Sequence, residues 1–276
     1  MGIVNITPDS FSDGGRFLAA DAAIEHGLEL IDEGAEILDL GAESTRPGGG
    51  VYGSGAVDVP VDEELRRLLP VIAGLRQQAP NAILSVDTRK GVVARRVLDA
   101  GADLINDVGG LQDPDLISAV ADAGVAVIAM HSRGALRDMQ RRIHFDKVVT
   151  EVRRELAEAL DRARIGGVPE DHVILDPGIG FGKGQTHNLA LIRHLDTLGS
   201  LGRPLLLGAS RKSFIAKIAE AEPTDRLGGS LAAAAWAARH GAAILRVHDV
   251  AATSQFLKVW HAIDSAPADG DESPSH

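Results

Sequence analysis

Eight short apolar runs, each followed by a stretch with the spacing of an amphipathic helix, recur along almost the whole chain. The runs are too short for helices and are bounded by turn residues, as in Val173 to Leu175 before Asp176. Near-continuous apolar strands that alternate with helices predict a parallel sheet whose outer face is covered. Eight such units in about 265 residues are typical of an α/β TIM (β/α)8 barrel, and a doubly wound open sheet is the alternative.

The expected elements can be placed along the chain from these patterns. We expect strands at 2–6, 36–40, 83–86, 104–108, 125–130, 173–175, 205–207 and 243–247. We expect helices near 19–33, 61–78, 90–100, 113–123, 146–164, 186–198, 212–220, 225–240 and 251–265. Glycines that precede strands, such as Gly34 and Gly124, fit the left-handed turn after a helix. The pattern predicts one domain over residues 1–264 and a disordered polar tail over 265–276.

Composition narrows the classes of function. The 276 residues are 45% hydrophobic, which is ample for a large core, and the net charge of −11 argues against a nucleic-acid binder. The chain has no cysteine, so it has no disulfide framework, thiolate nucleophile or thiolate metal site. No apolar run approaches the roughly 20 residues of a membrane helix. We therefore expect a cytoplasmic protein that binds neither nucleic acid nor a membrane.

The stretch from Asp176 to Lys183 joins the end of a buried strand to a glycine loop. A carboxylate in such a place is costly unless something pairs with it. Its two oxygens can accept two parallel N–H bonds, from an arginine or from an amino-heterocycle such as a pterin or guanine ring. Bonding to backbone N–H groups of the loop is the plainer interpretation, and the stretch alone leaves both open.

The same design, an apolar strand that ends in a polar residue, recurs along the chain. Because barrel active sites lie at the C-terminal rim of the strands, these residues are site candidates. The early strands end in amides and acids that can hold a polar heterocycle by its edge. Lys212, Arg246 and His248 follow the last two strands and can hold an anion, since phosphate sites are common there. Arg246 and His248 are two apart, so we expect them to share a face, and the helix that opens after Ser210 favours phosphate. Surface salt bridging is the plainer role for Lys212 and Arg246.

Seven ordered segments resemble dihydropteroate synthase, a pterin-binding family. They are NITPDSFSDGG at 5–15, ESTRPG at 43–48, SVDT at 85–88, NDV at 106–108, DPG at 176–178, SRKS at 210–213 and RVHD at 246–249. The match covers about residues 1–263 in register. The resemblance implies a transferase reaction. In it, the amine of p-aminobenzoate displaces pyrophosphate from 6-hydroxymethyl-7,8-dihydropterin diphosphate and gives 7,8-dihydropteroate.

The resemblance also implies residue roles. The pterin edge would be held by Asp87, Asn106, Asp176 and Lys212, with Met130 packed against it. The diphosphate would be held by Asn5, Arg246 and His248, and Asn5 would also meet Mg²⁺. The p-aminobenzoate pocket would comprise Phe11, Thr45, Arg46, Pro47, Phe181, Lys212 and Ser213. The catalytic set would be Asp9, Phe11, Arg46, Asp87, Lys212, Arg246 and His248, with Asp9, Ser10 and Arg46 on two mobile loops. A homodimer through the last helices is implied as well.

Two other functions remain open on the sequence. A pterin-binding methyltransferase barrel that works with a corrinoid protein shares the pterin-edge acids, but it does not need the Ser-Arg-Lys and Arg-x-His segments. A non-catalytic pterin-binding paralogue would be expected to have lost one of the diphosphate residues, and all are present. Formation of product from the pterin diphosphate, p-aminobenzoate and Mg²⁺ distinguishes all three.

Two departures from the family pattern stand out. Residues 49–61 are glycine-rich and about seven residues longer than the usual link, which indicates either a surface insertion or a border of the p-aminobenzoate pocket that changes sulfonamide discrimination. Deleting seven residues and comparing a sulfonamide's inhibition constant with the KM for p-aminobenzoate separates these two.

The chain also begins at the first strand, whereas relatives usually carry a short segment upstream that would cover the barrel bottom. We expect chemistry at the opposite rim to survive its absence. The sequence leaves open whether this is a housekeeping or a sulfonamide-insensitive form.

Overall fold

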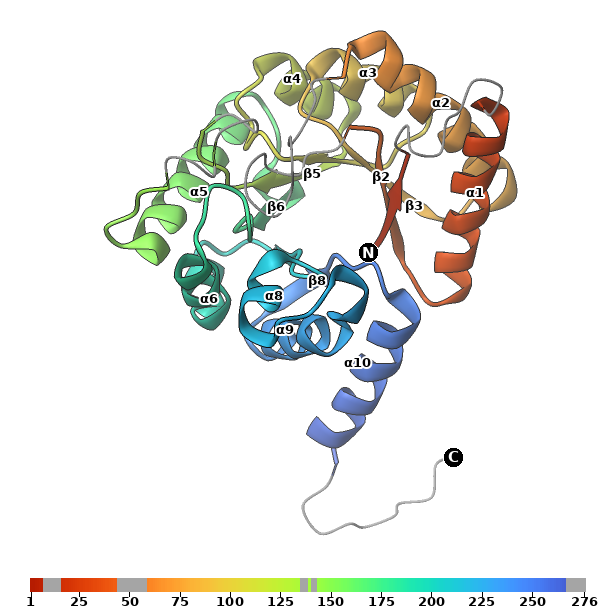
Figure 1. Ribbon diagram of the computed structural model, residues 1–276. Helices are drawn as coiled ribbons and strands as arrows, with labels where there is room; N and C mark the ends of the chain where they lie inside the picture. Colours follow the sequence, from red (N-terminus) through yellow and green to blue (C-terminus); the bar gives the residue numbers. More distant parts are fainter. Residues whose placement is uncertain (7–15, 44–58, 135–138, 140–142, 267–276) are drawn as a thin grey trace.

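The computed structural model describes residues 1–6, 16–43, 59–134, 139 and 143–266. Its strands form one parallel sheet in chain order, β1 to β8. A bridge between Gly2 and Val247 joins the last strand to the first, and the Ile3 N–H donates to the Val247 carbonyl at 3.1 Å. The sheet therefore closes into the predicted (β/α)8 barrel (Figure 1), and the open-sheet alternative is wrong. The strands are β1 Gly2–Asn5, β2 Ile37–Gly41, β3 Ile83–Asp87, β4 Leu104–Asp107, β5 Ala126–Met130, β6 Val173–Asp176, β7 Leu205–Leu207 and β8 Ala242–Leu245.

Helices cover the outside of the barrel (Figure 1). They are α1 Arg16–Asp32, α2 Val61–Gln78, α3 Gly91–Asp99, α4 Pro114–Ala123, α5 Val148–Ile165, α6 Gln185–Arg193, α7 Leu195–Gly199, α8 Ser213–Ala219, α9 Leu227–Arg239 and α10 Val250–Asp264. Short 3₁₀ turns, η3 Glu170–His172 and η4 Pro223–Asp225, precede β6 and α9. These bounds agree with the predicted elements to within about three residues at most ends. The predicted left-handed glycines are confirmed, with φ of 101° at Gly34 and 66° at Gly124.

One predicted helix is in fact two. The sequence pattern predicts a continuous helix near 186–198, but the chain breaks at His194, which has φ −109° and ψ 38°. Leucines on both sides of the break, Leu191 and Leu195, are fully buried. The bend lets both short helices keep their apolar side chains against the barrel, and no proline or glycine marks it in the sequence.

Two layers of apolar side chains make up the core. The larger lies between the strands and the helices, and the smaller fills the barrel interior with Leu104, Ile128 and Leu206, flanked by Ile37, Ile174 and Ile244. Because side chains alternate across a strand, the residues two positions further along also point into the barrel, nearer the C-terminal rim. On five of the strands or their ends these residues are Asp39, Asn106, Met130, Asp176 and Arg246. The alternation thus places a polar layer directly above an apolar floor.

Within the described residues, no helix is long and apolar enough to cross a membrane. The last helix, α10, extends away from the barrel (Figure 1), and only Val250 and Thr253 on it are buried. The predicted tail from residue 265 falls almost entirely outside the described residues.

Candidate active site

Strand pairing brings the predicted pterin-edge residues together at the C-terminal rim. Asp87 and Asn106 are register partners across β3 and β4, and Met130 and Asp176 are partners across β5 and β6. All four side chains are buried, with exposed fractions of 3 to 5%. The rim therefore presents three hydrogen-bonding side chains and one apolar wall within a single layer.

A fifth side chain, Asp39, holds residues of this layer in place through hydrogen bonds. It is fully buried and accepts hydrogen bonds from Ser85 Oγ at 2.6 Å, Asn106 Nδ2 at 3.0 Å and Arg246 Nε at 2.6 Å. Asp39 thereby fixes the amide of Asn106 with its nitrogen turned inward and its oxygen free to face the rim. Three donors on one buried carboxylate account for its presence in an otherwise apolar strand.

Two acceptor atoms of the layer have no donor in the part of the chain that the structure describes. Among the described residues, Asp87 Oδ1 and Asn106 Oδ1 are buried and have no hydrogen-bond partner. An unpartnered buried acceptor costs about 1–3 kcal/mol, so the pair indicates a ligand that brings N–H donors. Burial and the neighbouring Asp39 carboxylate raise the pKa of Asp87 well above its usual range, while Arg246, with Nη2 3.5 Å from Asp87 Oδ2, opposes the shift.

Lys212 and the loop after β6 lie beside Asp176. Asp176 Oδ1 accepts the Gly178 N–H at 2.7 Å, and Lys212 Nζ donates to the Ile179 carbonyl of the same loop. The ammonium also lies 4.9 Å from the centre of the Phe181 ring. Burial lowers the pKa of Lys212 to about 8, and burial raises that of Asp176, with each opposite charge limiting the other's shift. The two opposite charges therefore lie in the same half of the site and influence each other electrostatically.

The basic residues after β8 have different partners. β8 ends at Leu245, but strand-like pairing continues with the Arg246 N–H on the Leu207 carbonyl at 3.0 Å and the bridge at Val247, and the shared face of Arg246 and His248 stays a prediction. Arg246 turns inward to Asp39 and Asp87, whereas His248 Nδ1 lies 3.1 Å from Ser210 Oγ after β7. Both remain at the C-terminal rim, with Asn5 exposed at the end of β1 and Ser213 half-buried at the start of α8.

The remaining predicted residues lie outside the described part of the chain. They are Asp9, Ser10, Phe11, Thr45, Arg46 and Pro47, together with most of the 49–61 insertion. Their predicted roles in covering the site and in the p-aminobenzoate pocket stay predictions.

Comparison with known proteins decides the family. The family model described as "Pterin binding enzyme" matches residues 1–248. The chain belongs to the pterin-binding enzyme family.

Curated relatives place the chain among the dihydropteroate synthases of this pterin-binding enzyme family. It is 42% identical to the dihydropteroate synthase of Escherichia coli strain K12 over 266 residues, which cover 96% of the chain and 92% of the relative. It is 46% identical over 250 residues to a probable bifunctional folylpolyglutamate synthase/dihydropteroate synthase of Haloferax volcanii. That match covers 91% of this chain but only 29% of the longer relative.

Solved structures of pterin-binding enzymes agree with the fold. A dihydropteroate synthase of Xanthomonas albilineans with 4-aminobenzoic acid has 48% sequence identity and a TM-score of 0.88, and the match covers 97% of this chain and 93% of that one. The same enzyme in complex with 7,8-dihydropteroate has 46% identity and a TM-score of 0.84, covering 97% and 94% of the two chains.

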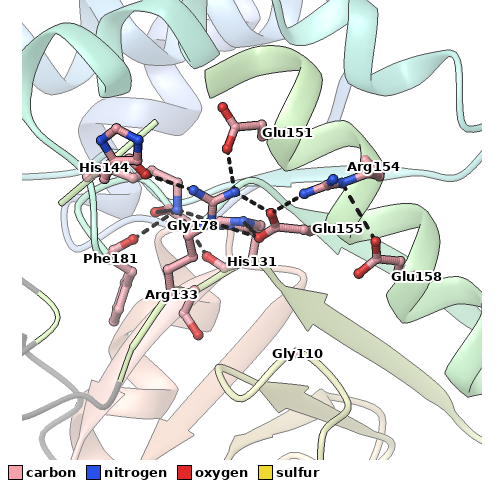
Figure 2. A network of polar contacts seen from close by, with 12 residues as sticks. Gly110, His131, Arg133, His144, Glu151, Arg154, Glu155, Glu158, Gly178 and Phe181 are labelled. Carbon is pink, nitrogen blue, oxygen red and sulfur yellow. Dashed lines mark hydrogen bonds and ion pairs between the residues drawn. The ribbon is translucent and has the colours of Figure 1, made fainter. Parts of the chain in front are cut away.

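Sequence reasoning missed two features of this pterin-binding site. The sequence analysis gives Asp39 no role, although a carboxylate inside an apolar strand indicates a buried polar network. Lys183 is predicted only to end the glycine loop, yet it is 3% exposed and contacts His131. His131 in turn contacts Glu155 (Figure 2). No spacing in the sequence links these three residues, because they meet only through the fold.

Proposed function

We propose that this chain is a dihydropteroate synthase, a transferase that joins p-aminobenzoate to 6-hydroxymethyl-7,8-dihydropterin diphosphate with loss of pyrophosphate. The observation that carries the proposal is a pair of buried acceptors, Asp87 Oδ1 and Asn106 Oδ1, that have no partner among the described residues and lie in the same inward-facing layer as Asp176. These oxygens match the N–H donors on the edge of a pterin ring. The likeness to structures that hold 4-aminobenzoic acid and 7,8-dihydropteroate supports the same substrates.

The charges of the site suit this reaction. Pyrophosphate departs from a carbon attached to the pterin, so positive charge develops on the ring and negative charge on the leaving group. Asp87 and Asp176 stabilise the positive charge on the ring, and Arg246 and His248 stabilise the negative charge on the leaving pyrophosphate. Because p-aminobenzoate is a weakly basic amine, we infer that ionisation precedes attack. Positional isotope exchange in the diphosphate without p-aminobenzoate tests this order, and complete absence of exchange would contradict it.

We infer that Mg²⁺ accompanies the diphosphate. Among the described residues no group of three carboxylate or histidine side chains could hold a metal, but the exposed amide oxygen of Asn5 fits an ion that is bound mainly by substrate phosphates and water. Such an ion, when bound, neutralises charge on the leaving pyrophosphate. Loss of activity in a chelator, restored by added Mg²⁺, is the expected result.

The direct test of the function is formation of 7,8-dihydropteroate by the purified protein. With both substrates and Mg²⁺ we expect product and stoichiometric pyrophosphate. Binding of the pterin without turnover would instead favour the non-catalytic paralogue. Methyl transfer from methyltetrahydrofolate to a corrinoid protein would favour the methyltransferase barrel.

The pKa values predict a pH profile for kcat/KM of the pterin diphosphate. The Lys212 ammonium is protonated below its pKa of about 8, so we expect kcat/KM to fall as the pH rises through that value. Because the diphosphate is already fully ionised near pH 8, this alkaline fall in kcat/KM reports a group on the enzyme and not on the substrate. On the acid side, the raised pKa values of Asp87 and Asp176 move the corresponding fall above the usual range of an aspartate. Lys212→Arg should remove the alkaline limb, because arginine keeps its proton. A flat profile to pH 10 in the native enzyme would contradict the assignment.

We also propose a homodimer through α8, α9 and α10. These helices carry exposed apolar side chains, with exposed fractions of 57% for Ile218, 44% for Trp236 and 71% for Ile263. Exposed apolar side chains of this size favour burial in a subunit interface. Light scattering after size-exclusion chromatography should give twice the 28.9 kDa of the chain, and Trp236→Glu should shift the mass to one chain. A native protein that stays monomeric at micromolar concentration would rule the interface out.

The cytoplasmic location stays a prediction of composition. The acidic, cysteine-free chain and small, soluble substrates support it. Fractionation of cells that express the protein, with enzyme activity found only in the membrane or secreted fraction, would contradict it.

A further inference from the structure

Lys183 is a buried lysine with no role in the chemistry described above. It is 3% exposed, and its Nζ lies close to four acceptors: Gly178 O at 3.0 Å, Phe181 O at 2.9 Å, and both Nδ1 and the carbonyl oxygen of His131 at 2.8 and 3.2 Å. Burying an amine is costly unless such partners are supplied. Lys183 Nζ therefore links the loop after β6, through Gly178 and Phe181, to the segment after β5, through His131.

His131 is itself held in place by α5. Its Nε2 lies 2.9 Å from Glu155 Oε2, and Arg133 Nε donates to the same oxygen at 3.0 Å (Figure 2). Burial lowers the pKa of His131 to about 4, so the ring is neutral near pH 7. A neutral ring that donates from Nε2 to Glu155 must accept at Nδ1, which is the atom that faces Lys183.

The loop after β6 packs tightly against the segment after β5. Gly178 has φ 66°, and a Cβ there would lie 1.9 Å from the His131 carbonyl oxygen. Gly182 has φ 62°, and a Cβ there would lie 2.7 Å from the Arg133 carbonyl oxygen. A cavity of about 200 Å³ borders His131 and Glu155 on the side of α5. The loop is therefore closely fitted to its neighbour, while the histidine has space beside it in which a changed side chain can be accommodated.

The other side of the same loop faces the reaction site. The Phe181 N–H donates to the Gly178 carbonyl at 3.1 Å and closes a turn, and Ile179 O on that turn accepts from Lys212. Phe181 places its ring beside the same ammonium. The Asp176 backbone is fixed by the strand ladder, since its carbonyl accepts the His131 N–H at 2.8 Å, while its carboxylate accepts the Gly178 N–H of the turn.

We propose that Lys183 is a positioning residue for the p-aminobenzoate side of the site. It draws the carbonyls of Gly178 and Phe181 inward, and the turn then presents the Ile179 carbonyl and the Phe181 ring to Lys212. The inference rests on the proposed function and deepens it. Strand pairing fixes the backbone of Asp87, Asn106 and Asp176, whereas the Phe181 ring and the Ile179 carbonyl depend on the turn. Loss of Lys183 should therefore disturb arylamine recognition more than pterin recognition.

The test separates KM values for the two substrates. In Lys183→Met we expect the KM for p-aminobenzoate to rise about tenfold or more while that for the pterin diphosphate stays within about threefold, because a small displacement of one contact surface suffices. Lys217→Met, the same change at an exposed lysine on α8, is the matched control and should leave both values unchanged.

Two His131 variants test the same contact independently, which provides a result even if Lys183→Met does not fold. His131→Asn places an amide oxygen near the Nδ1 position and keeps an acceptor for Lys183, and Glu155 stays paired with Arg133. His131→Gln reaches toward Glu155 but removes the Nδ1 acceptor. We expect the asparagine variant to resemble the native enzyme and the glutamine variant to show the raised KM for p-aminobenzoate. Equal changes in both KM values, or identical behaviour of the two His131 variants, would overturn the positioning role. A native enzyme that makes no dihydropteroate would instead reject the proposed function itself.

Discussion

Replacing Asp176 with asparagine is expected to weaken pterin binding by about a hundredfold or more, because two charge-assisted hydrogen bonds of about 1.5–3 kcal/mol each are lost or reversed. The asparagine oxygen can still accept the Gly178 N–H, which the native carboxylate accepts at 2.7 Å, so the loop should keep its shape. The amide nitrogen would then point a donor at the donors of the ring. Titration calorimetry with the pterin diphosphate gives the affinity, and Asp176→Ala should abolish binding altogether.

Asp171→Asn is the matched control for this change. Asp171 is exposed in the turn before β6, five residues from Asp176 and at the opposite end of that strand. Its substitution should leave the affinity unchanged. Near-native affinity and turnover in Asp176→Asn would show that the ring is not held at this carboxylate.

Asp39→Ala is expected to lower both stability and activity. The change leaves Arg246 and the Asn106 amide without the carboxylate that they both contact, and removing one partner of a buried ion pair costs about 3–5 kcal/mol. We expect the melting temperature to fall by roughly 5–15 °C in differential scanning calorimetry. Since Asn106 and Arg246 both lose their orientation, kcat/KM for the pterin diphosphate should fall about a hundredfold.

The control for Asp39 is an aspartate in an exposed ion pair. Asp122 is 62% exposed and lies 3.1 Å from Arg95 on the outside of the barrel. Asp122→Ala should cost less than about 1 kcal/mol and leave activity unchanged. If Asp39→Ala were equally mild, the buried network would not be what orders the rim.

Periodicity alone predicted the barrel and most of the rim. Apolar runs with a spacing of two fix which side chains point inward, so the polar residues at positions 87, 106 and 176 could be placed at one edge without coordinates. The helix break at His194 could not be predicted, because it depends on how two leucines fit the barrel surface rather than on a local breaker.

Contacts between segments that are far apart in the chain could not be predicted from the sequence. Lys183 and His131 are 52 residues apart and meet only because β5 and β6 are neighbours. Arg246 is predicted to hold the diphosphate with Asn5 and His248, but the sequence does not predict that its Nε donates to Asp39, which is 207 residues away. Long-range pairing of buried charges follows from tertiary packing, which local propensity and spacing do not encode.

The central claim is that carboxylates and an amide on the middle strands hold a pterin ring while basic groups after the last strands draw off its diphosphate. The most direct test is a crystal structure of the protein soaked with 6-hydroxymethyl-7,8-dihydropterin diphosphate. We expect the ring edge within hydrogen-bond distance of Asp87, Asn106 and Asp176, and the diphosphate toward Asn5, Arg246 and His248. A ring bound anywhere else, with Asp87 Oδ1 and Asn106 Oδ1 still unpartnered, would contradict the account.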